Sequence, residues 1–221
     1  MPFLLALLDP ALVVDLPAAV LAASGLDALS HAVESYVSPR ASPFTRAFSV
    51  QAIRTIAGAL PAAARAARPP GAGRRASMEA MLYGANLAGR SMLGHTGQVH
   101  AISRAVGAGF DTVHGLTNAV LLPVVLAYHE PALRTLLGEV GYLAGEPACA
   151  PGADAATAAA RALDTIIRLR DLVDAPARLR ELGVPRAALP RVAAEALRTE
   201  QSQNPRPATE ADLLAICERA W

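Results

Sequence analysis

The sequence contains no lysine, since all twenty of its basic residues are arginine. A protein without lysine cannot form a Schiff base, anchor pyridoxal phosphate or use a lysine as general base, which excludes several classes of enzyme. The arginines are nearly balanced by nineteen acidic residues, and the formal net charge is +1. Because so small a net charge creates no strong electrostatic field, we expect neither a nucleic acid nor a membrane surface as partner.

Cysteine is scarce, and Cys149 and Cys217 lie far apart and outside any CxxC pattern. They indicate neither a disulfide framework nor a thiolate metal site, so a reducing cytoplasm is the expected compartment. The N-terminal apolar run has no basic region before it and ends at Asp9 and Pro10, which argues against a signal peptide. The later run AVLLPVVLAY is shorter than the roughly 18 to 20 residues that span a bilayer, so no membrane segment is expected.

The residues that are abundant predict an all-α protein. Alanine, leucine and arginine dominate, 53% of the residues are hydrophobic, and apolar residues recur at spacings of three and four. We therefore expect one multi-helix bundle, a single helical domain over residues 1–221. The expected helices cover residues 17–37 with a weak point at Gly25, 42–60 ending near Gly58 and Pro61, 77–93, a short helix carrying His100, 116–130 with a kink at Pro123, and further helices up to one capped by Thr209. Loops are expected at 65–75 and 146–154.

The first residues do not fit this helical pattern. FLLALLDPALVVDLP, residues 3–17, reads as a short extended segment that runs out into a helix. The sequence offers no second strand to satisfy its backbone. Either the segment is not a strand, or its sheet lies on another polypeptide or in an upstream region. We expect Phe3 to Val14 to be poorly ordered or to pair with a partner chain.

A metal site is one interpretation of the histidines, which are His31, His95, His100, His114 and His129. Asp27 and His31 are four residues apart in GLDALSHAVES and therefore share one helix face, which suits two ligands of one ion or a hydrogen-bonded pair in a core. His100 is expected on a second helix and His114 in a glycine-flanked turn. Three imidazoles and one carboxylate suit Fe²⁺ or Zn²⁺ and not Ca²⁺ or Mg²⁺. Spacing alone does not establish that the four groups meet.

Three segments together carry a resemblance to a known family. DPALVVDLPAAVLAASGLDALSHAVESYVS, GQVHAISRAVGAGFDTVHGLTNAVLLPVVLAY and NPRPATEADLLAICERAW resemble the iron-containing alcohol dehydrogenases, which include maleylacetate reductases. The resemblance covers essentially the whole chain but only the C-terminal, helical half of that family. It implies metal ligands in a GxDAxxHxxE helix, on the next helix and in an xxHG turn. These positions are Asp27, His31, His100 and His114, with the family's fourteen-residue spacing between the last two.

The sequence departs from the family at Arg104. Family members have a histidine one helical turn after the third ligand, where it is regarded as a proton relay, and this chain has an arginine. Because a guanidinium stays charged at ordinary pH, Arg104 cannot shuttle a proton. It either holds an anionic group of the substrate or cofactor, or turns away into solvent or a salt bridge.

The sequence also lacks the family's nucleotide-binding half with its glycine-rich loop. PPGAGRR follows no strand and is expected to be a linker. In GHTG, Gly94 and Gly97 lie where a helix begins and are candidates for contact with a nicotinamide or a substrate; a simple helix-helix turn is the alternative. His129 is expected at a helix end, where the helix dipole stabilises it.

These observations predict a metal-dependent oxidoreductase domain that interconverts a small alcohol and a carbonyl compound. The resemblance implies NAD(P) as co-substrate, with Fe²⁺ or Zn²⁺ as Lewis acid. The expected partners are a nucleotide-binding chain or further copies of this chain. A metal-binding remnant or interaction subunit without catalysis, and metal-dependent chemistry without a nicotinamide, remain as alternatives.

Overall fold

The computed structural model describes residues 5–65, 72–92, 96–199 and 203–221, and these residues form helices and loops without a strand. The helices are α1 (Ala18–Val37), α2 (Pro43–Arg65), α3 (Ala72–Met92), α4 (Gln98–Phe110), α5 (His114–Leu143), α6 (Ala155–Asp171), α7 (Leu189–Leu197) and α8 (Glu210–Ala220). Four short 3₁₀ helices complete the order: η1 (Pro10–Leu12), η2 (Pro147–Cys149), η3 (Leu179–Leu182) and η4 (Arg186–Ala188). The all-α prediction is confirmed.

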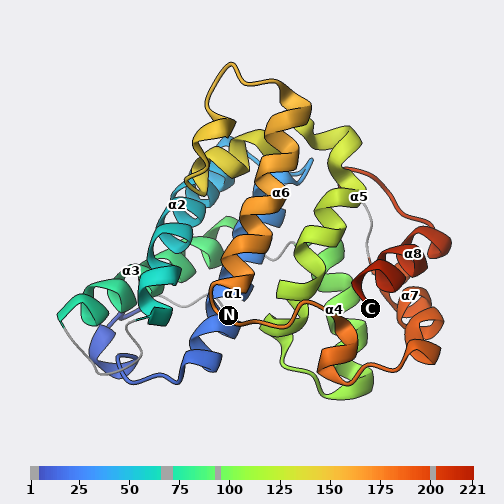
Figure 1. Cartoon of the computed structure of the whole chain (residues 1–221), viewed down its shortest axis with the longest axis horizontal. Coiled ribbons are helices and arrows are strands. Elements are labelled where there is room, and N and C mark those ends of the chain that lie inside the picture. Colours follow the sequence, from blue (N-terminus) through green and yellow to red (C-terminus); the bar gives the residue numbers. More distant parts are fainter. Residues whose placement is uncertain (1–4, 66–71, 93–95, 200–202) are drawn as a thin grey trace.

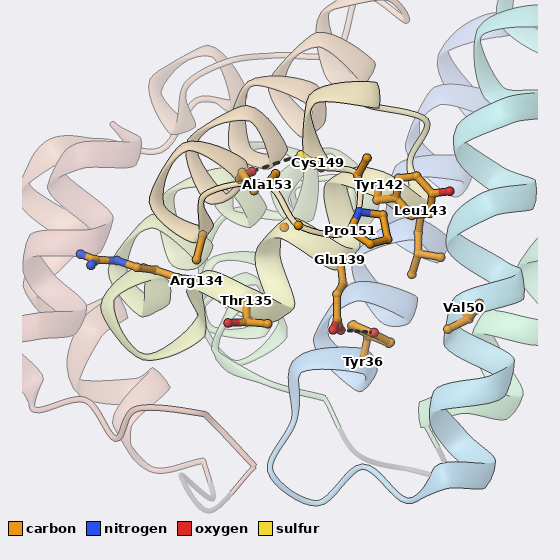
Figure 2. Close-up of a pocket in the computed structure, with 15 residues that line it drawn as sticks. Tyr36, Val50, Arg134, Thr135, Glu139, Tyr142, Leu143, Cys149, Pro151 and Ala153 are labelled. Atoms are coloured by element: carbon orange, nitrogen blue, oxygen red, sulfur yellow. Dashed lines mark hydrogen bonds between the residues drawn. The ribbon is translucent and has the colours of Figure 1, made fainter.

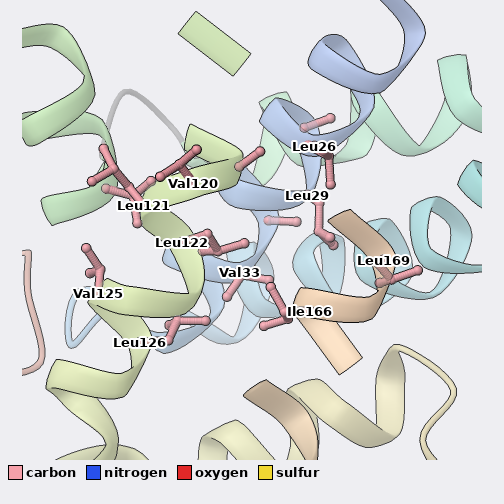
Figure 3. Packing of buried hydrophobic residues seen from close by; sticks show 14 of the residues in the cluster. Leu26, Leu29, Val33, Val120, Leu121, Leu122, Val125, Leu126, Ile166 and Leu169 are labelled. Atoms are coloured by element: carbon pink, nitrogen blue, oxygen red, sulfur yellow. The ribbon is translucent and has the colours of Figure 1, made fainter. Parts of the chain in front are cut away.

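Helices α1 and α5 form the middle of the bundle. The α2–α3 pair packs on α1 from one side, and α4 with α7 and α8 lies on the other side of α5 (Figure 1). The core between α1, α5 and α6 is made of leucine, isoleucine and valine side chains that point toward one another, among them Leu29, Leu122 and Ile166 (Figure 3). Burying one such side chain stabilises the fold by roughly 1.5–3 kcal/mol, so this packing fixes the relative positions of α1 and α5.

Helix α1 runs unbroken through Gly25, and the expected weak point is absent. A Cβ atom on Gly25 would lie 2.7 Å from Leu60 Cδ1 and 2.8 Å from Met81 Cε. The missing side chain therefore lets α2 and α3 approach α1 closely. This contact between helices, rather than a change of backbone direction, explains the glycine.

Helix α2 continues to Arg65, so the prediction that it ends near Pro61 is wrong. A proline inside a helix costs about 3 kcal/mol because it removes one hydrogen bond and crowds the preceding turn. Leu60 and Ala63, on either side of Pro61, are fully buried. We attribute the continued helix to this burial, which offsets the cost of the proline.

The expected loop at 65–75 overlaps the first turn of α3, which begins at Ala72; residues 66–71 lie outside the described residues. Arg74 in that turn is buried, and its guanidinium donates to the carbonyl oxygens of Val14 and Leu16. This contact holds the end of the N-terminal segment against α3. The segment itself is irregular with the short helix η1, and no extended strand forms in the part that is described.

Helix α5 is longer than expected at both ends. It starts at His114, which is its first residue and not part of a preceding turn, and it passes through Pro123 and Pro131 to Leu143. The prediction that His129 lies at a helix end is therefore wrong, and His129 is 2% exposed in the helix interior. Among the described helices, α5 alone is long and apolar enough to cross a membrane, and half of its apolar window is buried inside the bundle.

Two predicted local features are confirmed. Residues 146–154 form a break between α5 and α6 that contains η2. The Thr209 side chain accepts a hydrogen bond from the backbone N–H of Asp212 in a capping box that starts α8.

Candidate metal centre

Helix α1 presents three polar side chains toward α4 and α5. Asp27, His31 and Glu34 follow one another at spacings of four and three residues, so they lie on one face of the helix. The same stretch of α1 buries apolar side chains against its other neighbours, such as Leu26 and Leu29. The polar face is therefore held rigidly by the packing of the apolar one.

The donor atoms of the four predicted ligands converge on the Asp27 carboxylate. His100 Nε2 of α4 lies 3.5 Å from Asp27 Oδ1, and His114 Nε2 of α5 lies 3.6 Å from the same oxygen. His31 Nδ1 lies 3.9 Å from Asp27 Oδ2, and its ring stacks on that of His100 at 4.2 Å between centroids. Asp27, His31 and His100 each offer one donor atom within 4.8 Å of the others.

The rings of His100 and His114 are each oriented by a hydrogen-bond partner at the Nδ1 atom. His100 Nδ1 lies 2.6 Å from Glu34 Oε2, and His114 Nδ1 lies 3.0 Å from the hydroxyl oxygen of Ser103. Both partners are buried. Each Nε2 atom is thereby turned toward Asp27, which is the common arrangement of a metal-ligating histidine and its supporting hydrogen bond.

Asn118 of α5 shows that lone pairs are in excess at this point. Its Nδ2 atom lies 2.6 Å from Asp27 Oδ1 and 3.1 Å from the Nε2 atoms of both His100 and His114. An amide nitrogen carries two hydrogens, so it cannot donate to three acceptors at once. The Asn118 Oδ1 atom is buried and has no hydrogen-bond partner among the described residues. A cation that displaces the Nε2 proton of His100 would satisfy the lone pairs that then converge here from Asp27, His100 and His114.

The separations of the donor atoms fit a first-row metal ion. Two ligands that are each about 2.1 Å from a tetrahedral ion lie about 3.4 Å apart. The distances of 3.5 and 3.6 Å from Asp27 Oδ1 to His100 and His114 agree with that value. One carboxylate oxygen with imidazole nitrogens is a donor set that Fe²⁺ and Zn²⁺ accept, whereas Ca²⁺ and Mg²⁺ prefer oxygen throughout.

In the metal-free protein the imidazoles differ in protonation, and a metal ion would displace the Nε2 proton of His100. Burial and the charge of His100 lower the pKa of His31, and burial lowers the pKa of His114, so both imidazoles are neutral and have a free lone pair. Burial by itself would lower the pKa of His100, yet hydrogen bonds to Asp27 and Glu34 and the charges of these carboxylates raise it to about 9. Burial opposes ionisation of Asp27, but hydrogen bonding to His100 and the nearby His31 hold its pKa below the usual range.

The centre is closed on one side and open on the other. The side chain of His100 is 3% exposed, whereas that of His114 is 44% exposed. The centre is therefore accessible to solvent on the His114 side. Arg104, one turn after His100 on α4, is exposed and donates from Nη1 to the Thr96 hydroxyl oxygen at 3.2 Å. Its positive charge contributes to the lowered pKa of His114, after the larger effects of burial and of the neighbouring charged groups.

Of the two glycines predicted to contact a cofactor, Gly97 belongs to the described residues. Gly97 is the N-cap residue of α4, and its backbone N–H donates to Glu34 Oε2 at 3.0 Å. Gly94 and His95 lie outside the described residues. Cofactor contact at Gly94 and Gly97 stays a prediction.

Sequence reasoning did not identify Glu34, Ser103 or Asn118. Their spacing holds a weak signal, since Glu34 is seven residues after Asp27 and Asn118 four after His114 on their helices. Helical spacing places a side chain on a face but does not show which other helix meets that face. Only the packing of α1, α4 and α5 brings these residues together.

A second feature of the surface is separate from this centre. A cavity of about 350 Å³ lies beside α5, the η2 segment and the start of α6, and contains none of the four predicted ligands (Figure 2). In it the Tyr36 hydroxyl donates to Glu139 Oε2 at 2.5 Å. Burial and the hydrogen bond to the Glu139 carboxylate raise the pKa of Tyr36 to about 12.

Comparison with known proteins gives consistent matches over nearly the whole chain. The model for the C-terminal part of the Fe-containing alcohol dehydrogenase family matches residues 21–221. The 1,3-propanediol dehydrogenase of Klebsiella pneumoniae is 39% identical over 215 residues, which are 96% of this chain and 54% of that protein. The NAD-dependent methanol dehydrogenase of Bacillus methanolicus is 36% identical over 217 residues, 97% of this chain and 55% of that protein.

Solved structures agree with the sequence matches. A 1,3-propanediol oxidoreductase superimposes with a TM-score of 0.90 at 37% identity, covering 96% of this chain and 55% of that one. Maleylacetate reductase from Agrobacterium tumefaciens superimposes with a TM-score of 0.80 at 29% identity, covering 96% of this chain and 55% of that one. The chain spans about half the length of the curated relatives it matches.

Proposed function

The chain belongs to the Fe-containing alcohol dehydrogenase family, as its C-terminal part, and on this premise we propose that it binds one divalent first-row metal ion in an alcohol/carbonyl oxidoreductase site. The proposed ligands are Asp27, His31, His100 and His114, and the proposed ion is Fe²⁺ or Zn²⁺. The observation that carries the proposal is the convergence of the His100 and His114 Nε2 atoms on Asp27 Oδ1 at 3.5 and 3.6 Å. A metal ion bound there supplies Lewis-acid chemistry, by which an alcohol loses its proton more readily.

The chain's own residues would orient the reactants and restrict water. The buried wall of His100 and Glu34 closes one side of the centre, and the substrate enters past the half-exposed His114. The proposed reaction moves a hydride between the substrate carbon and NAD(P), with release or uptake of one proton. The printed names of the relatives, a 1,3-propanediol dehydrogenase and an NAD-dependent methanol dehydrogenase, support a small alcohol or aldehyde as substrate and a nicotinamide as co-substrate.

Arg104 would bind an anionic group and would not transfer protons. Its guanidinium remains charged at any ordinary pH, so a proton has to reach the solvent by water or by another group. Arg104 is exposed and has no carboxylate partner among the described residues. We assign to it the binding of an anionic group on the substrate or on the cofactor phosphate.

Dinucleotide binding would need a nucleotide-binding partner, because this sequence has no glycine-rich loop after a strand to hold a pyrophosphate. We propose that such a polypeptide, or further copies of this chain, complete the site in the cytoplasm. Gly94 and Gly97 at the start of α4 are the proposed contacts of this chain with the cofactor; because the Gly97 N–H donates to Glu34, Gly97 would allow a close approach rather than donate a hydrogen bond.

Metal content of the purified chain tests the proposal. The chain, reconstituted with Fe²⁺ without oxygen or with Zn²⁺, should hold about one ion per molecule by elemental analysis. Asp27→Ala and His114→Ala should each lose most of it. Glu195→Ala serves as control because Glu195 is exposed on α7 and pairs only with the exposed Arg198.

The measured metal content decides between a metal site and a hydrogen-bonded cluster that binds no metal. A correctly folded chain that takes up no ion under an excess of metal would mean that Asp27 and the histidines are a hydrogen-bonded core cluster. A chain that binds the ion, but shows no turnover with any nucleotide-binding partner, would be a metal-binding subunit without catalysis.

A further inference from the structure

Glu34 is a buried carboxylate directly beneath the candidate metal centre. Its side chain is 6% exposed. In the part of the chain described, it contacts neither the Asp27 carboxylate nor an arginine side chain. Its three close polar partners are the backbone N–H of Val99 at 2.7 Å, the backbone N–H of Gly97 at 3.0 Å and His100 Nδ1 at 2.6 Å. All three belong to the first turn of α4 or its N-cap.

We propose that Glu34 is the positioning residue of the metal centre: one carboxylate from α1 caps the N-terminus of α4 and, through the same contact, holds the His100 ring with Nε2 toward Asp27. The inference rests on the proposed metal-binding function. It assigns to Glu34 a role in metal affinity although Glu34 is not a ligand.

The cap is needed because α4 begins without one of its own. The first backbone N–H groups of a helix have no partner within the helix and are usually satisfied by a side chain at the N-cap. The N-cap of α4 is Gly97, which has no side chain. Glu34 supplies the missing acceptor from a neighbouring helix, and the positive end of the α4 dipole favours its negative charge.

Gly97 leaves the space that this carboxylate occupies. A Cβ atom at position 97 would lie 2.6 Å from Glu34 Oε1 and 3.0 Å from Asn204 Oδ1. The backbone of Gly97 has φ −95° and ψ −151°, an extended conformation that any residue adopts. The glycine is therefore required by the close approach of Glu34 and not by backbone strain.

The hydrogen bond to His100 settles which ring nitrogen faces the centre. Glu34 Oε2 accepts the Nδ1–H of His100, and on the opposite edge of the ring Nε2 lies 3.1 Å from Asn118 Nδ2 and 3.5 Å from Asp27 Oδ1. When a metal ion displaces the Nε2 proton, the ring keeps one N–H, and a proton held on Nδ1 by Glu34 leaves the Nε2 lone pair for the ion. A glutamine at position 34 can instead donate to Nδ1 and favour the tautomer whose Nε2 carries the proton.

Two substitutions in the full chain test this role. Glu34→Gln keeps the size of the side chain. It replaces a carboxylate, which only accepts hydrogen bonds, with an amide that can also donate them. Gly97→Ala keeps the side chains of Glu34 and His100. Its added Cβ atom would displace the Glu34 carboxylate from its position next to His100. The matched controls are Glu139→Gln, an exposed carboxylate of α5 that holds only Tyr36, and Gly107→Ala in α4, where a Cβ atom meets nothing within 4 Å.

Two readouts are measured for each folded variant. The Zn²⁺ dissociation constant is obtained by competition with a chromophoric chelator, and the nitrogen that carries the His100 ring proton by long-range ¹H–¹⁵N NMR. Zn²⁺ is used because it is diamagnetic. We expect Glu34→Gln and Gly97→Ala to weaken Zn²⁺ binding about 10- to 100-fold and to remove the Nδ1–H signal of His100, with both controls within twofold of the parent.

The opposite results would overturn the inference. If a folded Glu34→Gln or Gly97→Ala protein binds Zn²⁺ as tightly as the parent, Glu34 is only a helix cap. If the parent itself binds no Zn²⁺, the proposed function fails. The NMR spectrum of the metal-free proteins, recorded with His100 in its neutral form, then still decides whether Glu34 holds Nδ1–H, because loss of that signal in the two variants does not depend on a metal. An unchanged signal there contradicts the positioning role by itself.

Discussion

Asn118 Nδ2 lies 2.6 Å from Asp27 Oδ1, and this short contact joins α5 to α1 at the point where the histidines of α4 and α5 also meet. Asn118 is fully buried, and its second polar atom, Oδ1, has no hydrogen-bond partner in the part of the chain that the structure describes. The contact therefore stands in for part of the interaction that a cation would make with Asp27.

Asn118→Leu should destabilise the metal-free protein by about 1–3 kcal/mol, because it leaves the largely buried Asp27 carboxylate without its shortest hydrogen bond. Chemical denaturation followed by circular dichroism measures the change. Asn86→Leu is the control, since Asn86 accepts only a hydrogen bond from the exposed Arg90 at 3.2 Å. Equal stability of the parent and Asn118→Leu would show that the amide contributes nothing to the metal-free fold.

His129 should make the fold sensitive to acid. It is 2% exposed, and its Nδ1 atom has no hydrogen-bond partner among the described residues. Burial lowers its pKa to about 4, with the Glu34 charge opposing and the Arg206 charge assisting this shift. An unfolded histidine has a pKa of about 6.5, so between these values the unfolded chain binds more protons than the folded one. The stability that the neutral His129 contributes is thus present above pH 6.5 and is lost as the pH falls toward 4.

The measurement is the free energy of unfolding of the parent and of His129→Gln between pH 7 and pH 4. Relative to the variant, the parent should lose about 3 kcal/mol over this interval, since one pKa unit corresponds to about 1.4 kcal/mol. Parallel curves for the two proteins would mean that His129 is not held neutral by burial.

Arg104→Ala should raise the pKa of His114. Burial is the main cause of the lowered value, and the positive charge of Arg104 adds to it, so removal of that charge favours the protonated imidazole. NMR titration of the His114 ring in the metal-free protein measures the pKa. The control is Arg198→Ala, because Arg198 is an exposed residue of α7's C-cap that pairs with Glu195. An unchanged His114 pKa would place the Arg104 guanidinium away from the open side of the centre.

The chain alone should bind NADH and NADPH very weakly. A pyrophosphate requires clustered backbone donors at a helix N-terminus. At the start of α4 the N–H groups of Gly97 and Val99 already donate to Glu34. Calorimetric titration into the metal-loaded protein should give a dissociation constant above about 1 mM, and no alcohol oxidation should follow without a nucleotide-binding partner. Saturable binding in the micromolar range would contradict this expectation.

Several features of this protein follow from local sequence alone. The spacing of Asp27 and His31 puts both on one helix face, because a helix repeats every 3.6 residues. The capping box at Thr209 and the break at residues 146–154 are likewise local, since they depend on side-chain chemistry within a few residues. The recurrence of apolar residues at spacings of three and four predicted the helical class for the same reason.

Other features were decided only by tertiary packing. Helix α2 passes through Pro61 and α5 through Pro131 because buried neighbours offset the cost of each proline, and no local signal reports that burial. The same continuation of α5 places His129 in the interior. The contact of Glu34 with His100 spans 66 residues. Sequence spacing defines the face of one helix, whereas the meeting of two faces depends on the side chains that pack all the helices together.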